Sequence, residues 1–233
     1  MTQLEKLQKE IKSNKNSQKA LVLQRFFKTG KGEYGEGDIF YGIVVPIQRS
    51  ISKKYLDLTL TDLQKLIKSK IHEERLISLF ILIQKHKKAD EIQKEKIFNF
   101  YLKNTKRINN WDLVDLSAPN IIGDYLLNKN RQILYELAGS SDLWEKRIAV
   151  LATFAFIRQK DFKDALKISK ILLNDRHDLI HKAVGWMLRE IGKRNLATLE
   201  DYLQACYKKM PRTMLRYAIE KMEKNKRKFY LGK

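Results

Sequence analysis

Apolar residues recur every three to four positions along most of this chain, which is the spacing of one buried face of an amphipathic helix. The pattern is clearest in three segments, residues 73–87, 143–158 and 179–192. Weaker amphipathic stretches lie at residues 90–104, 129–138, 161–173 and 195–207. Short polar breaks separate these segments, so the chain is predicted to fold as successive helical hairpins.

The predicted hairpins repeat with a period of about 36 residues, which aligns Asp142 with Asp178 and, at twice the spacing, residues 71–75 with residues 143–147. A period of this length made of two helices is typical of HEAT-type repeats. We therefore expect an all-α fold, an α-solenoid of HEAT-like helical-hairpin repeats, in a single domain over residues 1–233. The alignment superposes three apolar sets at i, i+3, i+4 and i+7: Leu76, Leu79, Phe80, Ile83; Ile148, Leu151, Ala152, Ala155; Val184, Met187, Leu188, Ile191.

The repeat that starts at Arg107 departs from this pattern. Its positions that are apolar in the other repeats hold Asp112, Asp115, Leu116 and Pro119. Departures from local consistency are where function is expected. A structural role is easy to find for Asp112, because a carboxylate is favoured near a helix N-terminus. Asp115 is harder to explain in this way, because an ionised carboxylate in a partly buried place is costly unless it has a partner.

Helix register brings together four side chains of the types that bind ligands or catalyse reactions. Counted from repeat starts at residues 71, 107, 143 and 179, Trp111 and Arg147 lie at offset 4, Trp186 at offset 7 and Asp115 at offset 8. These offsets share one side of a helix, and equivalent helices of adjacent repeats stand side by side. The four residues are therefore predicted to line one short groove. Structural roles remain open for three of them: Trp186 in the core, Trp111 as a packing residue, and Arg147 paired with Glu145 or a neighbouring repeat.

The net charge of the chain indicates the class of partner that it binds. Its 233 residues hold 47 Lys and Arg against 27 Asp and Glu, a formal net charge of +20. Such an excess favours a polyanionic partner, and nucleic acid is the commonest one. On a solenoid it predicts a concave basic face. The alternative is that many lysines are solvated helix surface, and the basic ends at residues 1–30 and 221–233 are open to either interpretation.

Other chemistries find little support in the sequence. Cys206 is the only cysteine, and the four histidines have no cysteine partners and no HExxH spacing, so no disulfide, metal or cofactor is expected. The N-terminal segment is polar, and no apolar run approaches the roughly 18 residues of a membrane span. Residues 30–35 match GxGxxG formally. However, no βαβ unit surrounds them, and Glu33, Glu36 and Asp38 would repel a pyrophosphate, so a loop is expected there.

Five segments of the chain resemble the AlkD-like DNA alkylation repair proteins. The most specific are RINNWDLVDLSAPNIIGDY at residues 107–125, DLWEKRIAV at residues 142–150 and HKAVGWMLRE at residues 181–190. RFFKTGKGEYGEGD at residues 25–38 and MPRTMLRYA at residues 210–218 are similar to a common subgroup of the family. The resemblance covers nearly the whole chain and implies a fold of HEAT-like helical repeats.

The resemblance also implies an activity. Characterised enzymes of the family are monofunctional DNA glycosylases that release cationic N3- and N7-alkylpurines from duplex DNA without a deep base-flipping pocket. Asp115 matches the family's catalytic aspartate, Trp111 and Trp186 match its aromatic cleft residues, and Arg147 matches its active-site arginine. A monomeric cytoplasmic enzyme of bacterial type is expected, associated with the nucleoid when bound to DNA. The alternative is a non-catalytic DNA-structure-binding protein on the same scaffold, whereas a protein-binding solenoid has no need for Asp115 or for such charge.

Overall fold

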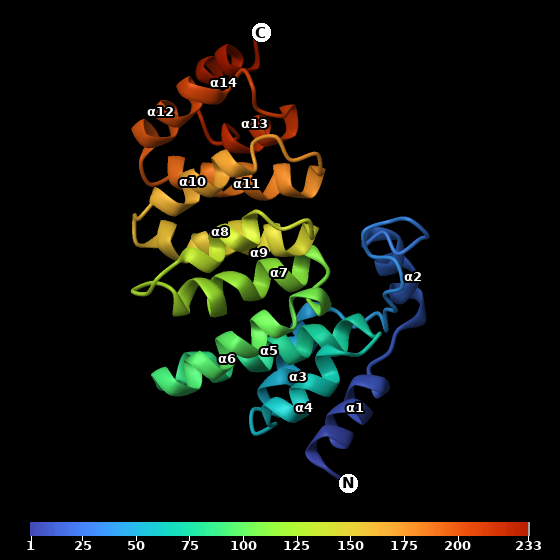
Figure 1. Cartoon of the computed structure of the whole chain (residues 1–233). Coiled ribbons are helices and arrows are strands. Elements are labelled where there is room, and N and C mark those ends of the chain that lie inside the picture. The colour runs from blue at the N-terminus through green and yellow to red at the C-terminus, as the bar shows by residue number, and fades with distance from the viewer. Residues whose placement is uncertain (233) are drawn as a thin grey trace. The chain divides into compact units, whose positions relative to one another are not determined.

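In the computed structural model, residues 1–232 are described and form fourteen α-helices joined by turns and short loops (Figure 1). Their one β-type pairing is a parallel bridge between Ile39 and Ile71. The chain divides into two compact units, Met1–Ser117 and Ala118–Lys233. Within residues 1–232 no helix combines the length and apolarity needed to cross a membrane. The expectation of an all-α fold built from helical hairpins is confirmed.

The first unit is organised around α5 (His72–Lys88), in which every residue from His72 to Ile83 is buried. The helices α1, α3, α4 and α6 all pack against it. The other elements of this unit are α1 (Gln3–Ser13), α2 (Ser17–Phe26), α3 (Val45–Lys53), α4 (Leu60–Ile67), α6 (Glu91–Lys103), the 3₁₀ turn η1 (Thr105–Arg107) and α7 (Trp111–Ala118).

The second unit has two central helices, α9 (Leu143–Arg158) and α11 (Asp178–Gly192). The helix α9 packs against η2, α8, α10 and α11, whereas α11 packs against α12 and α13. The remaining elements are the π-helical turn η2 (Pro119–Gly123), α8 (Gln132–Ala138), α10 (Lys163–Ile171), α12 (Leu196–Cys206), α13 (Arg212–Ala218) and α14 (Lys224–Leu231).

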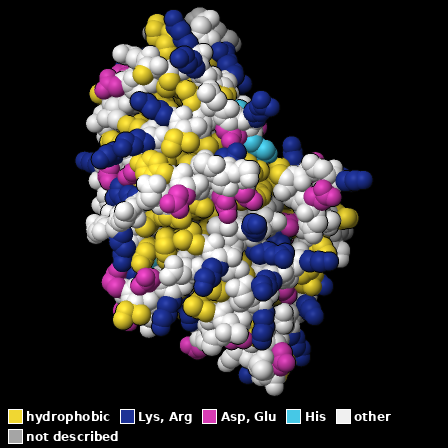
Figure 2. Space-filling model, in the orientation of Figure 1, with side chains coloured by type: hydrophobic (Ala, Val, Ile, Leu, Met, Phe, Trp, Pro, Cys, Tyr) yellow, Lys and Arg dark blue, Asp and Glu magenta, His cyan; other side chains and the backbone are white. Residues whose placement is uncertain are grey.

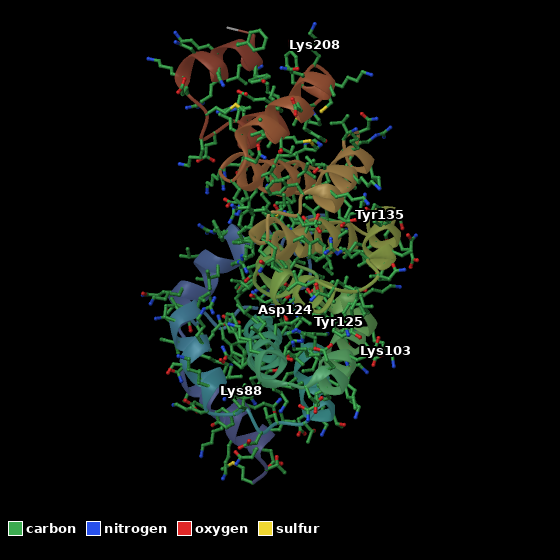
Figure 3. The ribbon with its side chains drawn as sticks, turned by 90° about the vertical axis from the view of Figure 1, so that its left-hand side faces the viewer. Lys88, Lys103, Asp124, Tyr125, Tyr135 and Lys208 are labelled. Carbon is green, nitrogen blue, oxygen red and sulfur yellow. The ribbon has the colours of Figure 1, made fainter. Side chains whose placement is uncertain are left out.

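An ion-pair cluster joins α8 to α10 in the second unit. Arg131 donates to Asp161 at 2.6 Å and to Asp164 at 2.7 Å. The hydroxyl of Tyr135, which projects from α8 in Figure 3, also donates to Asp164. The guanidinium lies 3.7 Å from the ring centre of Phe156, a buried residue of α9. This cluster therefore connects three successive helices around one side chain.

The apolar sets that defined the repeat form the core. Every residue of the three sets at i, i+3, i+4 and i+7 is buried. Helix α9 has the predicted bounds, and the bounds of α5, α6, α11 and α12 agree with the predicted segments to within one residue at each end. The polar breaks begin these helices: Asp90, Asp142 and Asn195 each accept a hydrogen bond from a main-chain N–H of the next turn.

The irregular repeat has a structural cause at Pro119. Proline has no N–H to donate inside a helix, and here α7 gives way to the wider π-helical turn η2. The turn also brings its backbone close to α9, because a Cβ added at Gly123 would collide with the main-chain oxygen of Ala152. The break in the apolar pattern therefore marks a real break in helix geometry, which directly follows the segment that carries Asp112 and Asp115.

Candidate functional site

The first residue of α7 is Trp111, and Asp115 follows it one turn later. Residues four apart on a helix share a face, so the indole and the carboxylate lie on the same side of α7. Both side chains are partly exposed. The side-chain oxygen of Asn110 accepts a hydrogen bond from the N–H of Trp111 at 2.8 Å, which fixes the start of the helix. The predicted neighbourhood of Trp111 and Asp115 is therefore present within the first unit.

A buried chain of charges holds the start of α7. The Nε2 atom of His72 lies 2.8 Å from the carboxylate of Asp112, and its Nδ1 atom lies 3.2 Å from Asp38. Arg75 contacts the same oxygen of Asp38 at 2.6 Å. All four residues are less than 9% exposed. Asp112 was expected to be structural, and this network gives it that role.

The network keeps the imidazole of His72 protonated. A carboxylate can only accept hydrogen bonds, so a ring that faces one at each nitrogen must donate from both. Burial lowers the pKa of His72, but the charge of Asp112 and the hydrogen bonds of Asp112 and Asp38 outweigh burial and raise it to about 9. Burial by itself raises the pKa of Asp38, yet His72 and Arg75 hold it below the usual range. His72 is thus a buried cation at neutral pH.

Aromatic rings connect this network to Trp111. Phe27 stacks on Trp111 with ring centres 5.0 Å apart and an angle of 14° between the planes. The stack then continues to the histidine. The ring centres of Phe27 and Phe40 are 5.0 Å apart, and those of Phe40 and His72 are 4.4 Å apart. The ring of Phe26 meets Trp111 at a steep angle, with ring centres 5.9 Å apart. Phe27 therefore covers one face of Trp111.

The glycine-rich segment is a loop, as predicted, and its own carboxylates hold it. Glu33 accepts the N–H of Gly30 at 2.8 Å, and Glu36 accepts the N–H of Gly32 at the same distance. A phosphate cradle needs such N–H groups for the ligand. Because acidic side chains already occupy them, the geometry gives no support to a nucleotide site at this GxGxxG match.

A buried glutamate anchors the chain that follows this loop. The carboxylate of Glu73, on α5, accepts the main-chain N–H groups of Tyr41, Gly42 and Ile43 at distances between 2.8 and 3.1 Å. Glu73 is fully buried. The helix α5 therefore positions the loop before α3 through Glu73. It also does so through His72 and Arg75, which both bind Asp38 of that loop.

Asp115 has a buried phenol in its electrostatic neighbourhood. The hydroxyl of Tyr101, a fully buried residue of α6, lies 2.8 Å from the hydroxyl of Ser117, which also donates to the main-chain oxygen of Leu113. Burial raises the pKa of Tyr101, and the negative charge of Asp115 raises it further, whereas the hydrogen bond with Ser117 lowers it. The carboxylate of Asp115 thus lies close enough to act electrostatically on a side chain of α6.

The other two predicted site residues belong to the second unit. Arg147 is buried on α9 and donates to the main-chain oxygen of Leu179, in the first turn of α11, at 2.5 Å. Trp186 is partly exposed on α11 and is not a core residue. Its ring lies 6.0 Å from that of Phe154, which carries the guanidinium of Arg158 on its face at 4.2 Å. Arg147 therefore does bind the neighbouring repeat, one of the roles that the sequence left open.

The structure thus places Trp111 and Asp115 on one face of α7 in the first unit, and Arg147 and Trp186 on the adjacent helices α9 and α11 of the second unit. One groove through all four residues stays a prediction. The sequence analysis missed His72 and Phe27, which hold Trp111 and the start of α7. For His72 a signal was present, because it stands with the acidic pair of Glu73 and Glu74 directly before a strongly apolar segment.

Comparison with known proteins gives the family. The sequence model of a family described as DNA alkylation repair enzyme matches residues 7–222. A solved structure titled a predicted DNA alkylation repair enzyme from Enterococcus faecalis has a similar fold, with a TM-score of 0.70 and 17% sequence identity over 91% of this chain and 98% of that chain. No curated protein matches this chain. Because the family match spans most of its length, the chain belongs to the DNA alkylation repair enzyme family.

Proposed function

We propose that this protein is a DNA glycosylase that hydrolyses the N-glycosidic bond of cationic N3- and N7-alkylated purines in duplex DNA. Family membership supports DNA as the partner and repair as the activity. The observation that carries the finer proposal is the position of Asp115, a partly exposed carboxylate on the same face of α7 as Trp111. Its neighbour Asp112 serves the buried pair with His72, so the two carboxylates of this helix have different tasks.

The chemistry of the lesion explains what a carboxylate would contribute. An alkylated purine cation is already a good leaving group, so the base needs no general acid. Breaking its bond to the sugar builds positive charge on the deoxyribose, as in glycoside hydrolysis. A fixed carboxylate stabilises that developing charge. Asp115 performs this task in the proposed mechanism and orients the water molecule that attacks the sugar, so that no cofactor takes part.

The aromatic and basic residues bind and orient in this mechanism. Indole rings attract cations through their faces, at about 0.5–2 kcal/mol each. Trp111 contributes the face that Phe27 does not cover, and Trp186 contributes a second ring. Arg147 contacts a backbone phosphate beside the lesion. Because Arg147 is only 5% exposed, this contact requires the duplex to approach α9 closely.

The charge of the chain supports binding of duplex DNA through many weak phosphate contacts, and the proposal takes the protein to be a monomer. Figure 2 shows Lys and Arg side chains spread over the face that it draws, with Asp and Glu side chains among them. Binding through such contacts weakens steeply as salt rises, because counterions are released from the DNA. The proposal places the protein in the cytoplasm, where the chromosome of a bacterial cell is accessible.

The test is release of free base from duplex DNA that carries N7-methylguanine or N3-methyladenine. The expected result is release by the unaltered protein and none by Asp115→Asn, with duplex affinity within a few-fold of the unaltered protein. Asp124→Asn is the control, because Asp124 is an exposed carboxylate shortly after α7 and is labelled in Figure 3. Equal loss of base release and of folding in Asp115→Asn would assign Asp115 to structure. Duplex binding without base release by the unaltered protein would favour a non-catalytic DNA-structure-binding protein.

A further inference from the structure

A polar hollow of about 720 Å³ lies between α13 and α14 in the second unit, and none of its lining residues has a role in the proposed function. Three arginines line it, Arg212 and Arg216 from α13 and Arg227 from α14. All three side chains are exposed. The hollow thus brings together guanidinium groups from the two sequence segments, residues 210–218 and 221–233, that the proposed function leaves without a role.

The acidic group at this hollow does not neutralise the arginines. Glu220 lines it as well, but its carboxylate is bound by Arg189 of α11 and lies 3.4 Å from Lys221. Within residues 1–232 no carboxylate lies within 4.0 Å of the guanidinium of Arg216 or Arg227. The hollow therefore carries an excess of positive charge.

The arginines are held by the packing of their helices. Met214, Leu215 and Ala218 are buried, which leaves Arg212 and Arg216, four residues apart, on an exposed face of α13. The helix α13 packs closely on α11, since a Cβ added at Gly185 of α11 would collide with the main-chain oxygen of Met214. The helix α14 is fixed by the buried ring of Tyr230 and by the ion pair of Lys226 with Glu200 at 2.5 Å.

One of the three arginines forms a hydrogen bond that stabilises the fold, and the other two do not. Arg212 donates to the main-chain oxygen of Leu231 at 2.9 Å, which ties α13 to the end of α14. Arg216 and Arg227 make no side-chain hydrogen bond of this kind within residues 1–232. These two guanidinium groups are therefore the ones that can turn toward a ligand in the hollow.

We infer that this hollow is a phosphate-binding site. Guanidinium groups are planar forks of N–H donors that match the oxygens of a phosphate, and they keep their charge at every physiological pH. The inference rests on the proposed function in one respect, because it expects the phosphate to be a backbone phosphodiester of the bound duplex. A free phosphate compound offers the same oxygens and is the other source.

Duplex binding tests the first source without requiring any base release. Arg216→Ala and Arg227→Ala are each expected to weaken binding of undamaged duplex about tenfold and to reduce the slope of log affinity against log salt by about one. Lys228→Ala and Lys224→Ala are matched controls, because they remove the same charge from exposed positions of α14 that do not line the hollow. Helical content measured by circular dichroism verifies that each variant is folded.

Inorganic phosphate tests the second source. In spectra of the arginine side chains, added phosphate is expected to shift the Nε–H signals of Arg216 and Arg227 in the unaltered protein. If neither arginine variant weakens duplex binding but phosphate shifts these signals, the site binds a free phosphate compound. If the arginine variants bind duplex like the lysine controls and phosphate shifts neither signal, the inference is wrong. Failure of the proposed function is distinguishable, since it would abolish base release and leave these readouts unchanged.

Discussion

Phe27 lies parallel to Trp111, with an angle of 14° between the two rings and 5.0 Å between their centres. One residue follows the end of α2 and the other begins α7, so this contact ties the N-terminal part of the first unit to the helix that carries Asp115. Stacked aromatic pairs contribute about 0.5–1.5 kcal/mol beyond the area that they bury. Phe27 thus fixes which face of Trp111 remains for a ligand.

Replacing Phe27 should therefore affect the proposed reaction without touching a substrate-binding residue. In Phe27→Leu we expect base release to fall about tenfold, because the indole of Trp111 loses the ring that sets its orientation. The measurement is single-turnover release of N7-methylguanine. Phe229→Leu is the control, since Phe229 is an exposed aromatic residue of α14. Unchanged release in Phe27→Leu would show that the stack has no part in positioning Trp111.

The protonated ring of His72 makes the stability of the fold depend on pH. Its pKa is about 9 in the folded chain and 6.5 in an unfolded one. A group whose pKa is raised by folding contributes its full stabilisation below the unfolded value and loses it as the pH rises through the folded value. The difference corresponds to a contribution on the order of 3 kcal/mol, present below about pH 6.5 and lost between about pH 6.5 and 9.

Urea unfolding of the unaltered protein and of His72→Asn across this range tests the prediction. We expect the free-energy difference between the two proteins to be largest below about pH 6.5 and to shrink steadily toward pH 9. His86→Asn is less suitable as a control because His86 is also buried, so His181→Asn, a partly exposed histidine of α11, is used instead. A difference that does not vary with pH would mean that folding leaves the pKa of His72 unchanged, and a difference that grows as the pH rises would mean that the ring is held neutral in the fold.

Periodicity predicted the helices of this protein because the buried faces repeat. The sets that contain Leu79, Leu151 and Leu188 are local patterns within one helix, and each is buried as expected. The position of Asp142 as a helix N-cap follows from the same local rules. Helix class and the bounds of five helices (α5, α6, α9, α11 and α12) were therefore readable from single segments of the sequence.

Contacts that join distant segments were not readable in this way. Asp38 and Asp112 both bind His72 although 34 and 40 residues separate them from it along the chain. The stack of Phe27 on Trp111 depends on the path of the loop between α2 and α3, for which periodicity gives no information. The sequence predicted where Trp111 and Asp115 lie on their helix, whereas the residues that hold this helix in place required the fold.

The anchoring of the loop before α3 by Glu73 leads to a further prediction. Its carboxylate accepts three main-chain N–H groups, from Tyr41, Gly42 and Ile43, in a fully buried place. Glu73→Gln keeps one acceptor oxygen, but it removes the charge that strengthens all three hydrogen bonds and places an NH₂ group where Oε2 accepted the N–H of Tyr41, which costs about 1–3 kcal/mol. Hydrogen exchange of these three amides should become faster. The exposed Glu95→Gln on α6 should leave it unchanged, and equal protection in Glu73→Gln would contradict the assigned anchor.

Two tryptophans of the second unit separate a functional from a structural role. Trp186 is partly exposed on α11, whereas Trp144 is 7% exposed on α9. Truncating a buried tryptophan costs about 3–5 kcal/mol, because it removes a large apolar surface and leaves a cavity. Trp144→Ala should therefore lower the melting temperature strongly. Trp186→Ala should change it little, yet lower base release at least tenfold by removing a ring that holds the cationic nucleotide. Paired thermal unfolding and excision assays measure both effects, and a Trp186→Ala protein as unstable as Trp144→Ala would assign Trp186 to packing.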